Sequence, residues 1–191
     1  MHRHTTRTLA TALLALALLF TTACSQQHKW TEQERRATRE MLRDWREILY
    51  LNELSEEEFA LFRSRVADQL EESYPIYAEF IEMPMMGDSV EMVILATIVT
   101  EIKATPTKMR HIFPYTYLVE EGYLPKGLSH LHQDEFYHCV ASKVNRDYGS
   151  IQQFVWDAFH YRLDDLLVTQ ILRSCAAPYW SHTPPEIVIM D

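Results

Sequence analysis

Side chains of types that bind metal ions are concentrated at residues 130–138 and 157–160: His130, His132, Asp134, Glu135, His138, Asp157 and His160. Imidazole nitrogens and carboxylate oxygens are ordinary protein ligands of zinc and iron. On two facing helices, five of these side chains could surround one metal ion: His132, Glu135, His138, Asp157 and His160. The sequence therefore permits a metal-dependent enzyme.

Two acidic-x-x-His pairs occur in this region, Glu135 with His138 and Asp157 with His160. They resemble half of the ligand set of di-iron carboxylate helical bundles, where such pairs project inward beside two further glutamates. The helical phase disagrees with this resemblance, because His138 points about 200° away from the apolar Phe136 on the same helix. We therefore expect surface residues and no cofactor, and the metal enzyme stays as an alternative.

Other catalytic signatures are missing from the sequence. It contains no G-x-S-x-G nucleophile motif, no P-loop, no dinucleotide fingerprint and no C-x-x-C-H haem attachment. No serine or cysteine is spaced with a histidine as a nucleophile and its base require. The sequence therefore favours a protein that is not an enzyme.

Residues 1–23 have the pattern of a secretory signal peptide, with Arg3 and Arg7 ahead of an apolar run at residues 9–20. The run is shorter than the roughly 20 residues that a helix needs to cross a bilayer. The following Thr21-Thr22-Ala23-Cys24 resembles the lipobox of bacterial lipoproteins, in which the cysteine is lipidated and becomes the new N-terminus. The usual leucine is replaced by Thr21, so ordinary cleavage near Ala23 stays open.

The lipobox resemblance implies that Cys24 anchors the mature chain to a membrane of the cell envelope, facing the periplasm. Residues 24–30 would then form a short polar tether, residues 31–177 the folded domain, and residues 178–191 an irregular tail rich in proline. No residue of the tether distinguishes the inner from the outer membrane.

The remaining two cysteines, Cys139 and Cys175, are 36 residues apart. An unpaired thiol is a liability in an oxidising compartment, so we expect a disulfide between them. A metal-binding or redox-active pair is the alternative, although neither cysteine lies in a C-x-x-C motif.

The mature chain is acidic and apolar enough to fold. The whole sequence has a net charge of -9 and is 47% hydrophobic. Loss of Arg3 and Arg7 with the signal peptide leaves 16 basic against 27 acidic residues. Phosphate binding needs clustered lysine and arginine, so a nucleic-acid partner is disfavoured.

Apolar spacing and capping residues predict an all-α bundle of about six helices without a significant sheet. Thr31 with Glu34 and Ser55 with Glu58 form capping boxes that open two helices. The expected helical segments are residues 31–50, 55–74, 75–84, 90–102, 105–121 with a break at Pro114, 129–148 and 151–175, with a turn at residues 87–89.

Residues 50–100 and 123–175 share an order of apolar and capping residues, which suggests an internal duplication and two tandem three-helix units. The alignment pairs Ser55 with Ser129 and Phe59 with Phe136. The first copy has a break at residues 84–89, so residues 151–175 should bend near residues 160–162. A bend also lets Cys139 and Cys175 approach, which one straight helix of about 37 Å would prevent.

Two further apolar groups could contact a partner, although packing within the domain is the commoner outcome. The first group contains Phe80, Ile81, Met83, Met85, Met86 and Met92. The second contains Tyr179, Trp180 and residues 187–190.

The combined pattern favours a non-enzymatic periplasmic lipoprotein that binds or scaffolds another envelope protein. An immunity or inhibitor protein against an envelope toxin is a further alternative. Small helical periplasmic proteins with a disulfide that neutralise such toxins look broadly similar, which is an analogy of fold alone.

Overall fold

The computed structural model describes residues 29–180, so Cys24 and the residues from 181 lie outside the described part. The elements are α2 (Glu32–Met41), η1 (Leu42–Trp45), α3 (Glu56–Ser73), α4 (Tyr77–Glu82), α5 (Met86–Ala104), η2 (Pro106–His111), α6 (Tyr115–Glu120), α7 (His130–Asp147), α8 (Ile151–Phe159) and α9 (Asp165–Trp180). The described residues contain no strand, which confirms the all-α fold class. The helices are shorter and more numerous than expected.

The predicted capping residues open their helices. Thr31 and Ser55 each accept a hydrogen bond from the backbone N–H of a glutamate three residues later, and the glutamate carboxylate accepts one in return. Ser129 caps α7 and Ser150 caps α8 through their hydroxyl oxygens. These bonds satisfy N–H groups that a helix start leaves without a partner.

The first helix ends earlier than the sequence predicts. The α-helix stops at Met41, η1 follows to Trp45, and a turn brings Tyr50 inward at a φ of 79°. The side chain of Tyr50 is buried, and its hydroxyl donates to Glu101 at 2.6 Å. A helix that continued to Tyr50 could not take this left-handed conformation, so the tertiary contact overrides the helical pattern.

Two more boundaries differ from expectation. The predicted turn at residues 87–89 lies inside the first turn of α5, which starts at Met86. Pro178 does not end the last helix, because α9 continues to Trp180. A proline near a helix end removes only one backbone hydrogen bond. The Trp180 indole also holds this end by donating to the carbonyl of Tyr123 at 2.8 Å.

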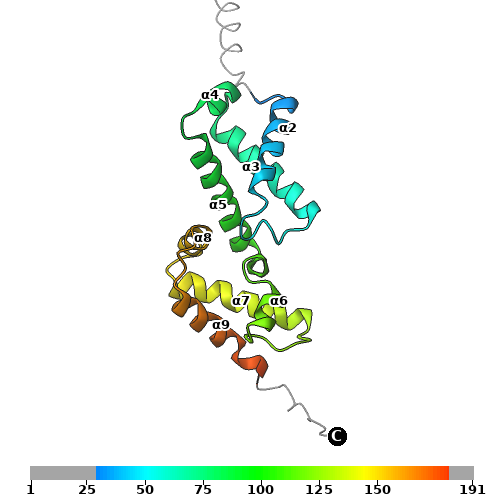
Figure 1. The fold of residues 1–191 in the computed structure, drawn as a ribbon, viewed down its shortest axis with the longest axis vertical. Coiled ribbons are helices and arrows are strands. Elements are labelled where there is room, and N and C mark those ends of the chain that lie inside the picture. Colours follow the sequence, from blue (N-terminus) through cyan, green and yellow to red (C-terminus); the bar gives the residue numbers. More distant parts are fainter. Residues whose placement is uncertain (1–28, 181–191) are drawn as a thin grey trace, which may run out of the picture.

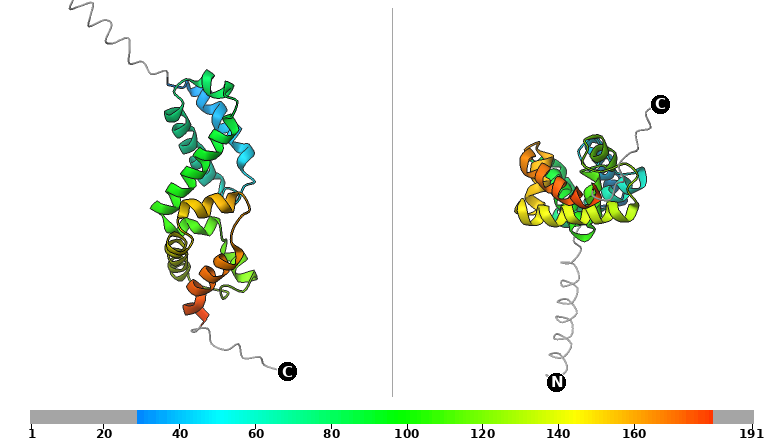
Figure 2. Two further views of the ribbon diagram at one scale, coloured as in Figure 1. Left: turned by 90° about the vertical axis from the view of Figure 1, so that its left-hand side faces the viewer. Right: turned by 90° about the horizontal axis from the view of Figure 1, so that it is seen from below.

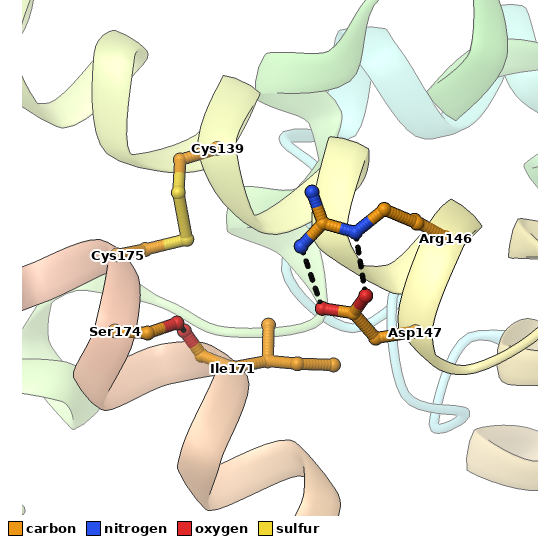
Figure 3. Close-up of a disulfide and its surroundings, with 6 residues drawn as sticks. All are labelled: Cys139, Arg146, Asp147, Ile171, Ser174 and Cys175. Carbon is orange, nitrogen blue, oxygen red and sulfur yellow. Dashed lines mark hydrogen bonds and ion pairs between the residues drawn. A yellow bond between two sulfur atoms is a disulfide. The ribbon is translucent and has the colours of Figure 1, made fainter.

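Residues 151–175 form two helices, because α8 ends at Phe159 and α9 begins at Asp165. Tyr161 in the connection has a φ of 55°. The bend lets α9 return along α7, and a disulfide joins Cys139 to Cys175 with a Cα–Cα distance of 5.8 Å (Figure 3). This is the cysteine pair that the sequence predicts.

The helices repeat in the same order: α3 and α7, and likewise α4 and α8, start 74 residues apart, whereas α5 and α9 start 79 residues apart. We call residues 31–104 the first unit and residues 105–178 the second unit. Helices α3 and α7 both have 18 residues and follow Ser55 and Ser129. Their buried residues correspond at four positions: Phe62, Val66, Ala67 and Leu70 in α3, and Phe136, Val140, Ala141 and Val144 in α7. The sequence alignment, which paired Phe59 with Phe136, was therefore three residues out of register there.

The repeat extends through the other helices. The rings of Tyr74 and Phe80 lie 5.4 Å apart, as do those of Tyr148 and Phe154. Helix α3 packs on α5, and α7 packs on α9. The Arg65–Glu101 ion pair in the first unit occupies the positions that Cys139 and Cys175 occupy in the second. A common origin of the two units remains a prediction.

The two units lie in tandem along an elongated molecule (Figure 1). They are joined where α8 of the second unit packs on α5 of the first, which a perpendicular view also shows (Figure 2). At this junction the ring of Phe159 stacks on that of Trp45 at 6.4 Å. One hydrophobic cluster runs through both units, so the described residues share a continuous core.

Candidate functional site

The five residues of the alternative metal site do not come together. His132, Glu135 and His138 are exposed on α7. Within residues 29–180, no group of three or more His, Cys, Asp or Glu side chains could hold a metal ion. The structure therefore contradicts this arrangement of ligands.

Asp157 and His160 have structural partners instead. The carboxylate of Asp157 accepts hydrogen bonds from the Tyr148 hydroxyl at 3.0 Å and the Gln153 amide at 2.9 Å. His160 Nε2 lies 3.1 Å from a carboxylate oxygen of Glu91 on α5. These contacts hold α8 within the second unit and against the first.

A groove of about 560 Å³ lies between α5 and the beginning of α8. Its lining residues are Met92, Leu95, Ala96, Val99, Thr100, Lys103, Ser150, Gln152, Gln153 and Trp156. A volume of this size is in the range of ligand and peptide sites. The groove was not predicted from the sequence, because its two walls are about 50 residues apart in the chain.

Small side chains on α5 create the space. Ala96 and Thr100 lie four residues apart, so they occupy one face of the helix, and both are exposed. Leu95 and Val99 beside them are almost fully buried and form an apolar floor. The half-buried indole of Trp156 closes the opposite wall. The groove is thus lined about equally by apolar and by polar side chains.

The lining of the groove differs in charge from the chain as a whole, which is acidic. The chain contains 27 acidic residues, yet none of the residues that line the groove is acidic, and Lys103 is basic. Glu91, near the Trp156 wall, is already paired with His160, whose ring stacks on Trp156 at 4.3 Å. An approaching neutral or acidic segment therefore meets little repulsion in the groove.

A second cavity, of about 450 Å³, lies between the two units and is lined in part by Glu58, Arg110, His111, Tyr115 and Tyr137. His111 is only 4% exposed, and its Nε2 has no hydrogen-bond partner among the described residues. The nearest carboxylate oxygen, on Glu58, is 3.9 Å away. Nothing in the sequence around His111 marks it as a buried histidine.

Burial and the neighbouring cations lower the pKa of His111 to about 4. Desolvation is the largest cause, followed by repulsion from Lys108 and Arg110, while Glu58 and a hydrogen bond with the Glu53 backbone oppose the shift. The imidazole is therefore neutral at pH 7, and protonating it in the folded state is unfavourable.

We expect the protein to lose stability on mild acidification because of His111. Its unfolded-state pKa is about 6.5, so the unfolded chain binds the proton first as the pH falls. Between pH 6.5 and 4.5 the free energy of unfolding should drop by about 2 kcal/mol. Urea unfolding at both pH values measures the drop, and the H111Q variant should lack it. An equal drop in H111Q would assign the effect to other groups.

A buried ionic network lies beside this cavity. The Glu101 carboxylate accepts hydrogen bonds from the Tyr50 hydroxyl and from Arg65, and Lys108 Nζ lies 3.7 Å away. Burial and the bond to Glu101 raise the pKa of Tyr50, so the phenol stays protonated. The network ties α3, α5 and η2 together, and its partners account for its charges without a ligand.

The other apolar groups divide between core and surface. Phe80 is buried, and Met83 and Met86 pack against the core, whereas Ile81, Met85 and Met92 are exposed. Near the end of α9, the ring of Tyr179 lies 5.7 Å from that of His132. The predicted packing of the Tyr179–Trp180 stretch on the domain is therefore present, while residues 187–190 lie outside the described part.

No helix among the described residues has the length and apolar character needed to span a membrane. Comparison of the chain with family models, with curated proteins and with solved structures gives no match.

Proposed function

We propose that this protein is a membrane-tethered lipoprotein of the cell envelope that binds a segment of another envelope protein in the α5–α8 groove. The observation that carries the proposal is the open groove on an acidic chain, with a mixed apolar and polar lining that contains no acidic residue. The role is binding rather than catalysis, and the lipid on Cys24 keeps the groove near the membrane.

The lining of the groove indicates what it would bind. Met92, Ala96 and Trp156 offer an accessible apolar surface on which one or two aliphatic or aromatic side chains can pack. Ser150 and Gln152 along one edge carry a hydroxyl and an amide that can bond to a peptide backbone. The occupant that fits best is therefore a short apolar segment, neutral or flanked by a carboxylate that reaches Lys103.

Site-specific photo-cross-linking tests the proposal in the native envelope. A photoreactive side chain at position 96 should form a discrete adduct with one envelope protein, whereas the same group at the exposed position 68 on α3 should not. The W156A variant should reduce the adduct at position 96 about tenfold, because it removes one wall of the groove. Circular dichroism of W156A checks that the helices remain.

Intact mass of the protein from the membrane fraction tests the tether in the same preparation. A diacyl or triacyl addition on Cys24 is expected. An unmodified N-terminus or ordinary cleavage near Ala23 would contradict the tether. An adduct that forms equally at positions 68 and 96, or that persists in W156A, would contradict binding in the groove.

A further inference from the structure

The α4 end of the first unit has an exposed apolar face. Ile76, Ile81 and Met85 are 41%, 49% and 62% exposed, and we call these three residues the α4 face. Pro75, Ala78 and Pro84, which are close to them in the sequence, are also exposed. This face lies at the end of the elongated molecule that is distant from the second unit (Figure 1).

The repeat shows what the corresponding face does in the second unit. At an offset of 74 residues, Ile81 corresponds to Val155 and Met85 to Phe159. Val155 is only 3% exposed, and with Phe159 it borders a small cavity together with Leu49 and Ile98 of the first unit. The outer face of α8 is thus covered by the preceding unit, whereas within residues 29–180 no other unit covers α4 in this way.

In the second unit, the surface of α9 that corresponds to the groove wall of α5 is polar. Leu95, Ala96 and Val99 form the α5 wall of the groove beside α8, and these positions correspond to Thr169, Gln170 and Arg173 on α9. Arg173 and Gln170 are exposed polar residues, as expected for a terminal repeat that faces water. The α4 face has no such polar replacement, so this end is not adapted to solvent.

The chain enters the fold beside the α4 face. The indole of Trp30 donates to the Tyr74 carbonyl at 2.8 Å and lies 5.0 Å from the ring of Tyr77 and 5.2 Å from that of Phe80. Trp30 is six residues after Cys24, and six residues span at most about 21 Å. A lipid on Cys24 would therefore hold the α4 face within reach of the bilayer.

We propose that the α4 face rests on the membrane leaflet that holds the Cys24 lipid, with Ile76, Ile81 and Met85 between the head groups. This inference depends on the proposed tether and adds an orientation to it. The neighbouring Glu79 and Glu82 are exposed carboxylates, so the face fits a zwitterionic lipid surface better than an anionic one. The α5–α8 groove would then project away from the bilayer.

Depth-dependent fluorescence quenching tests this orientation with the lipidated full chain in phosphatidylcholine vesicles. An environment-sensitive fluorophore is attached to I81C or to the matched control L131C, since Leu131 is 67% exposed in the second unit. Spin-labelled lipids should quench the label at position 81 at least threefold more than the label at position 131. Vesicles with one third phosphatidylglycerol should reduce this difference.

Flotation of the vesicles distinguishes the two ways of failing. If the protein does not float with the vesicles, the tether and the proposed function fail. If it floats and the two labels are quenched equally, the orientation alone is wrong. If the label at position 81 is already shielded in unlipidated C24S protein, and sedimentation gives a dimer mass, a second copy covers the α4 face and the membrane proposal is overturned.

Discussion

Replacing Glu101 with alanine should lower the free energy of unfolding by about 3 kcal/mol. The Glu101 side chain is 7% exposed and accepts from Tyr50 and Arg65. Its removal leaves the buried Tyr50 hydroxyl without a partner, which costs about 1 to 3 kcal/mol, and it also leaves Lys108 near an apolar cavity. The loss of unfolding free energy is limited because the Arg65 side chain is half exposed and can turn toward water.

Urea unfolding of E101A against the parent protein at pH 7.5 gives this difference directly. The matched control is E40A, because Glu40 also pairs with an arginine, Arg43, but both side chains are about 60% exposed. Exposed pairs contribute between 0 and about 1 kcal/mol, so E40A should unfold almost like the parent. Equal effects of the two substitutions would show that the burial of Glu101 does not determine its contribution to the free energy of unfolding.

Removing the disulfide should cost a similar amount, roughly 3 to 4 kcal/mol. Cys139 and Cys175 close a loop of 36 residues, and opening it gives the unfolded chain many more conformations. The loss should concentrate in the second unit, because the bond ties α9 to α7. Amide hydrogen exchange should therefore accelerate most over residues 165–180.

The double variant C139A/C175A and the reduced parent protein provide two independent measurements. Their free energies of unfolding should agree within about 1 kcal/mol, since alanine fills a little less of the core than the disulfide. Reductant should lower the stability of the parent protein and leave the double variant unchanged. If reductant has no effect on the parent, the cysteines are not linked in solution.

Local sequence signals predicted the elements that depend on local interactions. The capping residues Thr31, Ser55 and Ser129 start helices where expected, because each bonds to a backbone N–H within three residues. The bend between α8 and α9 followed from two separate arguments, the aligned break in the first copy and the reach of Cys139 to Cys175. Both depend on spacing along the chain.

Features that depend on distant residues were missed. A carboxylate at position 101 in an apolar run was the one visible sign of the buried network, but its partners Tyr50 and Arg65 are 51 and 36 residues away. The groove likewise needs α8 to cross α5. The register of the repeat was misread inside α3 because a shift of three residues preserves most of a 3.6-residue apolar pattern.

The shared positions of the Arg65–Glu101 ion pair and the Cys139–Cys175 disulfide have a consequence for maturation. An ion pair forms as soon as its helices meet, whereas a disulfide needs an oxidant. The first unit can thus complete its cross-helix link in any compartment, and the second unit completes its own only where an oxidant is present. Protein produced in a reducing cytoplasm would contain the Arg65–Glu101 ion pair in its first unit and would lack the Cys139–Cys175 disulfide in its second.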